Sequence, residues 1–90
     1  MKDRYLPLDR LHEGQLGRVH AIESAGSMRR RLQDIGIIEG TEVQCLQKSF
    51  SGDPVAYLIR GAVIALRQED SERILVEATS FDRGREKVLS

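Results

Sequence analysis

The chain has 90 residues, 40% of them hydrophobic, which is enough for one small domain that buries about 60 to 65% of its unfolded surface. Fourteen basic residues balance fourteen acidic ones, so no overall field attracts nucleic acid or an anionic membrane, and a charged partner must meet a local patch. No apolar run approaches the roughly 20 residues of a membrane helix, and the first ten residues lack the apolar middle of a secretory signal, which predicts a cytoplasmic protein not inserted in a membrane.

The N-terminal part predicts one helical turn and one strand. Leu8 and Leu11 lie three residues apart after a proline, a spacing typical of a single turn packed against a domain. Residues 15–23 then alternate in polarity, which places Val19 and Ala21 on the same side of a strand.

The next segment predicts a short amphipathic helix. Met28, Leu32 and Ile35 recur at helical spacing and define one buried face. Ser24 or Ser27 is expected to cap the first turn by accepting a backbone N–H bond. Both the start of the helix and its buried side are therefore predicted.

A corner and a second strand follow the helix. Gly36 stands where helices commonly end in a left-handed residue, and Gly40 completes a tight turn. Residues 41–45 then predict a strand with Val43 and Cys45 on one face. This single cysteine cannot form an internal disulfide, so we expect a small buried apolar side chain in a reducing compartment.

Two further strands form a predicted hairpin. Residues 50–54 contain turn-forming types, and Pro54 can open a strand but not lie inside its ladder, while Gly52 supplies turn flexibility. The segments 55–60 and 63–67 are apolar at both alternating sets of positions. Such a hairpin is expected to curl over itself or to meet a second surface.

The last elements complete a mainly β fold. Residues 68–73 predict one polar turn, and 74–76 predict a fifth short strand. Closing five strands into a small barrel with one inserted helix removes exposed edges. We assign residues 1–78 to this domain and expect a flexible tail at 79–90.

Three stretches of the sequence together resemble one known family. They read LDRLHEGQLGRVHAI near the start, MRRRLQDIGIIEGTEV in the middle, and SGDPVAYLIRGAVIALRQEDSERILVE after it. This order resembles the FeoA family, ferrous iron transport protein A, over Leu6 to Glu77. Ser71 departs from it, because such domains often carry alanine there. The resemblance implies an SH3-like barrel and a cytosolic accessory of FeoB, the GTP-binding membrane transporter of ferrous iron.

The residues that carry chemistry do not form a catalytic or metal-binding motif. His12, His20 and Cys45 are the soft metal ligands, and none is paired at ligand spacing. No serine or cysteine lies in a nucleophile motif, and residues 52–54 lack the lysine of a phosphate loop. We therefore predict no enzyme activity, no cofactor and no metal site. Transition-metal binding is therefore a description of the family and not a prediction for this chain. The resemblance implies a role in iron uptake rather than coordination of iron.

Three successive arginines start the predicted helix. Residues 29–31 fan through roughly 200 degrees of a helix, so they cannot all contact one ligand. Arg30 and Arg31 stand four and three residues before Asp34, a spacing that favours intrahelical pairing. The remaining possibility is contact with acidic surface on a partner, which suits the planar guanidinium.

Two sets of residues follow from these arguments. The candidates for partner contact lie on the helix and the hairpin, and they are Arg29, Arg30, Leu58, Arg60 and Val63. The residues assigned to the architecture are Met28, Leu32, Ile35, Gly36, Gly40, Val43, Gly52, Pro54 and Ile59.

Alternative functions keep the barrel but change its partner. SH3-like domains also follow the DNA-binding part of iron-dependent repressors, so a regulatory module of that kind is one alternative. A nucleic-acid-binding barrel is another, although zero net charge and the absence of a helix-turn-helix pattern count against it. Weak self-association is left open, whereas proline-rich ligands are disfavoured because the chain has only four aromatic residues.

Overall fold

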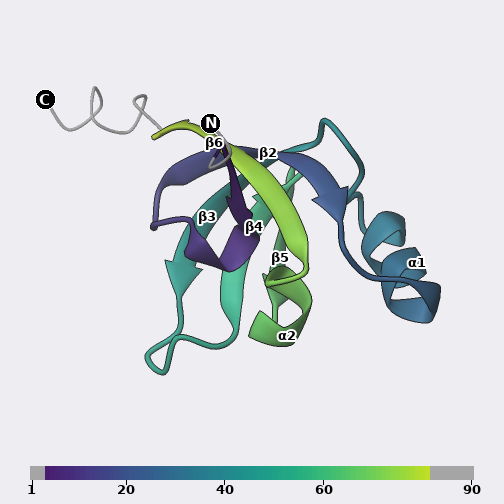
Figure 1. The fold of residues 1–90 in the computed structure, drawn as a ribbon. Coiled ribbons are helices and arrows are strands. Elements are labelled where there is room, and N and C mark those ends of the chain that lie inside the picture. Colours follow the sequence, from purple (N-terminus) through teal and green to yellow (C-terminus); the bar gives the residue numbers. More distant parts are fainter. Residues whose placement is uncertain (1–3, 82–90) are drawn as a thin grey trace, which may run out of the picture.

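A computed structural model describes residues 4–81, which form a curled antiparallel sheet flanked by two short helices (Figure 1). In chain order the elements are β1 (Tyr5–Pro7), the 3₁₀ turn η2 (Leu8–Arg10), β2 (Gln15–Ile22), α1 (Gly26–Asp34), β3 (Glu42–Lys48), β4 (Val55–Ile59), β5 (Ala62–Leu66), α2 (Gln68–Ser71) and β6 (Ile74–Phe81). The mainly β fold with an inserted helix is as predicted. Strand β6 continues to residue 81, past the boundary assigned at 78, and residues 82–90 of the expected tail lie outside the described residues.

The strand order is β1-β6-β2-β3-β4-β5, so the last strand lies between the first two. The structure has six strands rather than the predicted five or so, and the additional strand is β1. Its three residues end at Pro7, too short a run to show alternation. Within the described part β1 and β5 are not paired with each other, so the sheet curls as an SH3-like barrel does without closing its hydrogen-bonded ring.

The core fills the inside of this curled sheet. Strands contribute most of it, Leu32 comes from α1, and the turn around η2 supplies two leucines that belong to the core cluster. The buried hydrophobic residues are Leu8, Leu11, Val19, Ile22, Leu32, Ile37, Val43, Cys45, Val55, Tyr57, Ile59, Leu66, Ile74 and Val76. Met28 and Ile35 are half-buried and pack against this cluster.

Strand β2 does not keep the strict alternation expected from the sequence. Its register against β6 shifts between Val19 and Ala21, so Val19 and Ile22 are buried while Ala21 is only half-buried. An extra residue in one strand reverses which side chains face inward, and polarity alone does not reveal where it sits.

The start of α1 differs from the prediction, whereas its end follows it. The N-cap residue is Ala25 and no side chain caps the helix, so the expected serine cap is wrong. At the other end the Gly36 N–H donates to the Gln33 carbonyl and the Ile37 N–H to the Leu32 carbonyl, both at 3.0 Å. This pair of bonds is a Schellman motif, which requires the positive φ of 106° at Gly36.

The segment after α1 is fixed to β2. Thr41 donates from its hydroxyl to the Gly36 carbonyl at 3.0 Å. The Gly40 N–H donates to the Val19 carbonyl and the Val19 N–H to the Thr41 carbonyl, each at 2.8 Å. The corner therefore places the C-terminal end of α1 beside the sheet rather than leaving it on a free loop.

Candidate partner-binding surface

The outer face of the sheet carries one row of side chains across four strands. Leu16 on β2 stands opposite Gln44 on β3, which stands opposite Leu58 on β4, which stands opposite Val63 on β5. We call these four residues the outer row. Leu16 and Leu58 are half-buried, whereas Val63 is 68% exposed. Because neighbouring residues in a strand point to opposite faces, this row lies opposite the core.

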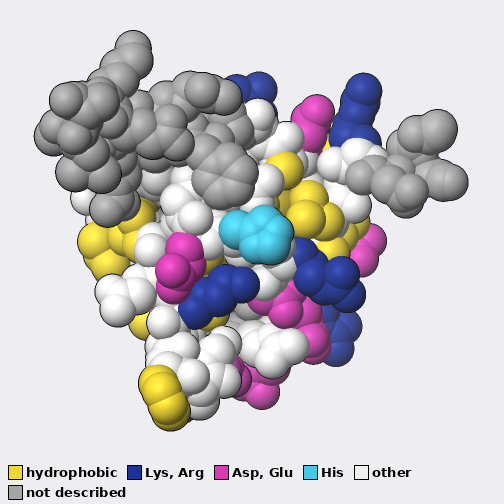
Figure 2. All heavy atoms as spheres, turned by 90° about the vertical axis from the view of Figure 1, so that its left-hand side faces the viewer, with side chains coloured by type: hydrophobic (Ala, Val, Ile, Leu, Met, Phe, Trp, Pro, Cys, Tyr) yellow, Lys and Arg dark blue, Asp and Glu magenta, His cyan; other side chains and the backbone are white. Residues whose placement is uncertain are grey.

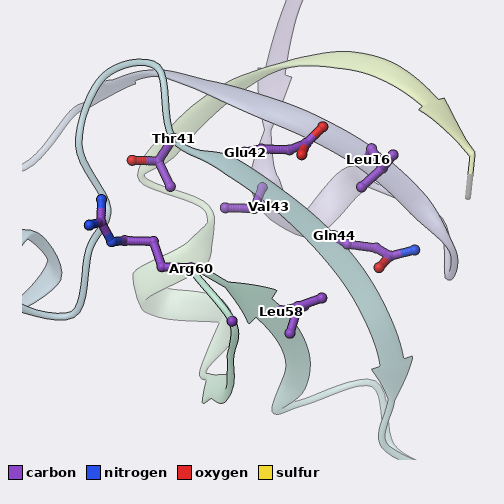
Figure 3. Close-up of a pocket in the computed structure, with 8 residues that line it drawn as sticks. Leu16, Thr41, Glu42, Val43, Gln44, Leu58 and Arg60 are labelled. Carbon is purple, nitrogen blue, oxygen red and sulfur yellow. The ribbon is translucent and has the colours of Figure 1, made fainter.

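A shallow hollow of about 310 Å³ lies on this face (Figure 3). It is lined by Leu16, Thr41, Glu42, Val43, Gln44, Leu58, Arg60 and Gly61. Its walls combine apolar side chains with one acidic and one basic residue. Such a surface suits contact with a mixed polar and apolar segment better than enclosure of a small apolar ligand.

Arg60 lies in the two-residue turn between β4 and β5. It adopts a positive φ of 51° and Gly61 one of 84°, as in the type I′ turns that fit the twist of hairpin strands. A Cβ added to Gly36 would lie 2.6 Å from the Arg60 Cδ, so the bare glycine makes room for the arginine stem. The guanidinium extends away from Leu16 and Leu58 (Figure 3), and it has no ion-pair partner among the described residues.

The three arginines of α1 have three different environments. Arg29 donates from Nη1 to the Ile22 carbonyl at 3.0 Å, which ties the helix to the end of β2. Arg31 donates from Nη2 to Asp70 Oδ2 at 2.7 Å. Arg30 is exposed and forms no hydrogen bond or ion pair within residues 4–81.

The expected pairing with Asp34 is therefore wrong for Arg31, which instead joins α1 to α2. Asp70 is 6% exposed and its second oxygen, Oδ1, is buried without a partner in the described structure. A buried carboxylate gains far more from a guanidinium than the exposed Asp34 would, which explains the choice of partner. Together with Ile64, Ala65 and Leu66 of β5, these two side chains help to line a hollow between α1 and the hairpin.

Two buried titratable side chains lie in the core. Burial raises the pKa of the Cys45 thiol, and the nearby Lys48 partly opposes this shift. Burial also raises the pKa of Tyr57, whose hydroxyl has no partner in hydrogen-bonding geometry although Ser71 and Asp9 lie near it. The prediction of Cys45 as a small buried apolar side chain is confirmed.

The candidate metal ligands are dispersed. In the part of the chain that the structure describes, no three His, Cys, Asp or Glu side chains gather where they could hold a metal ion. His20 stacks on Tyr5, with ring centroids 3.8 Å apart and planes 10° apart. On the face drawn in Figure 2, basic and acidic side chains are interspersed rather than gathered by sign.

The predicted contact residues fall into two groups. Leu58, Arg60 and Val63 lie together on the hairpin, whereas Arg29 and Arg30 lie on α1. The sequence analysis missed the residues that complete the outer face, which are Leu16, Glu42 and Gln44. Their alternation with buried neighbours on β2 and β3 was the available signal, but it does not tell which strands lie side by side.

The fold places this protein in the class of small SH3-like domains. The solved zinc complex of FeoA from Stenotrophomonas maltophilia, described as a prokaryotic SH3 domain protein, superposes with a TM-score of 0.73 at 24% identity, covering 80% of this chain and 89% of that one. A sequence model of the FeoA domain matches residues 6–78, so the chain belongs to the FeoA family. The resemblance read from the sequence is confirmed.

Two relatives are 30% or more identical to this chain in sequence. A FeoA-like protein from Clostridium acetobutylicum has 30% identity and a TM-score of 0.80, covering 88% of this chain and 92% of that one. A fusion of Fe(2+) transport protein A with the Fe(2+) transporter FeoB, from Porphyromonas gingivalis, is 33% identical over 73 residues. That match covers 81% of this chain but only 9% of the fusion protein.

Transcriptional repressors share the fold without close sequence similarity. A manganese-dependent repressor superposes with a TM-score of 0.76 at 22% identity, covering 83% of this chain and 41% of the repressor. This likeness concerns the SH3-like fold alone. In the described residues no helix is long and apolar enough to cross a membrane.

Proposed function

We propose that this chain is a non-enzymatic, cytoplasmic accessory of a FeoB-type ferrous iron transporter and acts by binding the cytosolic part of that transporter. The observation that carries the proposal is the Porphyromonas gingivalis fusion, in which a segment 33% identical to this chain shares one polypeptide with FeoB. Covalent linkage keeps two domains at a high effective concentration, which is useful when they work in contact. Ferrous iron is then the cargo of the transporter rather than a ligand of this chain.

The outer face and the hairpin support contact as the mode of action. The outer row provides apolar area, while Arg60 and Arg30 provide charges without ion-pair partners among the described residues. Protein interfaces are more apolar at their centres than elsewhere, and arginine is enriched in them.

A calorimetric titration of the full chain with the transporter's cytosolic part, with and without guanine nucleotide, tests this proposal. We expect saturable binding in at least one nucleotide state, weakened by Leu58→Asp and kept by Arg10→Glu on η2, which does not line the hollow of the outer face. Absence of binding in both states, together with unchanged ferrous uptake after deletion of the gene, would contradict it.

A regulatory or nucleic-acid-binding module is the second candidate, favoured by the fold shared with the manganese-dependent repressor. It predicts salt-dependent retardation of DNA or RNA in a gel-shift assay. This alternative would be excluded if the chain binds the transporter part but does not retard DNA or RNA in the gel at low salt.

A further inference from the structure

The sheet has two free edges, and they differ in protection. Strand β1 is three residues long, ends at Pro7 and follows Arg4, which pairs with Glu77 at 3.8 Å. A short strand with a proline and a charge is how proteins commonly protect an edge. Strand β5 reads AVIAL, five residues without a charge, a proline or an irregular register against β4.

The register tells which backbone groups β5 leaves free. Ile59 and Ala62 flank the two-residue turn and form a hydrogen-bonded pair, and pairs then alternate along an antiparallel ladder. The next pair, Leu58 and Val63, is therefore not hydrogen-bonded, and the N–H and C=O of Val63 point away from β4. The same holds for Ala65, and neither residue bonds to another described segment outside the sheet.

The side chains of Val63 and Ala65 are also exposed to solvent. Val63 is 68% exposed, and Ala65 is exposed as well. On the inner side Ile64 is half-buried and Leu66 is buried, so β5 remains anchored while its outer face stays accessible. At the Ala65 end, the edge borders the hollow that β5 shares with α1 and α2. An added strand would thus meet free donors and acceptors together with the apolar end of the outer row.

Charges at both ends indicate what could occupy this edge. Arg60 precedes β5 and Arg67 follows it, both are exposed, and neither has an ion-pair partner within the described chain. A second copy pairing antiparallel through its own β5 would bring Arg60 of one chain near Arg67 of the other, and like charges across strands are destabilising. An incoming strand with carboxylates about seven residues apart would meet opposite charges instead.

We propose that the β5 edge binds an extended segment of a partner protein, apolar in its middle and acidic at both ends, which adds a strand to the sheet. The backbone of Val63 and Ala65 supplies the hydrogen bonds, Leu58 and Val63 supply the apolar contact, and Arg60 and Arg67 select the acidic ends. The inference rests on the proposed function only for the identity of the partner, the cytosolic part of the transporter.

The test uses the full chain and two synthetic peptides of about nine residues, each with alternating valine and threonine in the middle. One carries two glutamates at each end and the other two lysines. We expect the acidic peptide to bind, in fluorescence anisotropy, with an affinity that falls as salt is added. Amide hydrogen exchange should slow at Val63 and Ala65 when it binds.

Two substitutions at one position separate backbone from side chain. Val63→Pro removes the outward N–H without removing a ladder bond to β4, so binding should weaken roughly tenfold. Val63→Thr keeps both the N–H and the branched shape and should retain most of the affinity. If Val63→Pro does not fold, as judged by circular dichroism, the exchange protection and the double reversal Arg60→Glu with Arg67→Glu decide, with Arg10→Glu as the matched charge control.

Each outcome has a definite meaning. Equal binding of the lysine peptide, unchanged binding by the proline variant, or protection confined to other strands would overturn the inference, as would a dimer that Val63→Pro dissolves. If the transporter part binds the wild type and the proline variant equally, the edge inference fails and the proposed function stands. If the acidic peptide binds the edge but the transporter part does not bind the chain, the reverse holds.

Discussion

At the scale of single residues, Gly36 connects three features of the molecule. Its positive φ allows the Schellman end of α1, its bare Cα leaves space for the Arg60 stem, and its carbonyl accepts the Thr41 hydroxyl. One residue without a side chain thus joins the helix, the corner and the hairpin turn.

Gly36→Ala should lower the free energy of unfolding by about 1 to 2 kcal/mol, because an L-residue is strained at this φ. The new Cβ would also displace the flexible Arg60 side chain, which adds a smaller cost. Urea denaturation measures both. Gly40→Ala is the matched control, since its φ is 92° with nothing within 4 Å, and the difference between the two variants should vanish in an Arg60→Ala background.

Cys45 should make the protein less stable at alkaline pH. Because burial raises the pKa of its thiol, the folded chain keeps a proton that the unfolded chain releases. This contribution is present below the ordinary thiol pKa of about 8.5 and is lost as the pH rises through the higher folded value. The fall in unfolding free energy between about pH 8 and pH 9.5 should be shallower in Cys45→Ala. An equal slope in both proteins would contradict the prediction.

Tyr57→Phe should leave stability within about 1 kcal/mol of the wild type or raise it. The hydroxyl is buried without a hydrogen-bond partner in the described structure, so its removal relieves an unsatisfied polar group without opening a large cavity. Thermal unfolding followed by circular dichroism checks this. A loss of about 2 kcal/mol or more would instead mean that Ser71 or Asp9 holds the hydroxyl.

At the scale of elements, α1 is held by one apolar anchor and two polar ties. Leu32 is fully buried, Arg29 binds the end of β2, and Arg31 binds Asp70 on α2. The bond from Arg29 reaches back seven residues, whereas that from Arg31 spans 39 residues of the chain. A nine-residue helix is too short to be stable by itself in water, so these ties account for its presence.

Leu32→Ala should cost about 2 to 5 kcal/mol, the range for a fully buried leucine. Met28→Ala, at a half-buried position of the same helix, should cost clearly less and serves as the control. Chemical denaturation of both variants measures the two losses of unfolding free energy. Similar losses would contradict the prediction that Leu32 is the main apolar contact of α1 with the core.

Arg31→Ala should cost about 1 to 2 kcal/mol, because it leaves the buried Asp70 carboxylate without its charged donor. Arg30→Ala, on the same helix but without a described partner, should change stability by less than about 0.5 kcal/mol. The comparison is made by urea denaturation at low and at high salt. Equal effects of the two substitutions would show that the ion pair does not hold α1 to α2.

At the scale of the whole molecule, the six-stranded sheet is complete only when the last strand pairs with the first two. Strand β6 pairs with β1 on one side and with β2 on the other, so the last strand completes contacts begun by the first two. The two outermost strands of this sheet are β1 and β5. They differ, because β1 is short and ends at a proline, whereas β5 is five residues long without a charge or a proline.

The fold and parts of the candidate site could be predicted from the sequence wherever the signal is local. Helical spacing gave the buried face of α1, Gly36 marked its end, and both strands of the apolar hairpin were predicted to within one residue, although Arg60 lies in the turn and not in the strand. The hairpin's outer face was expected to be covered, yet Val63 is largely exposed, because period-two patterns tell which residues share a face but not what lies against it.

The sequence by itself determined the family, the element types and the buried cysteine, because motifs, turn chemistry and periodicity act over a few neighbouring residues. Only the tertiary structure decided the partner of Arg31, the contact of Gly36 with Arg60, the shifted register of β2 and the joining of Leu16 to the outer row. The physical reason is common to all four, since each depends on segments far apart in the chain that packing alone brings together.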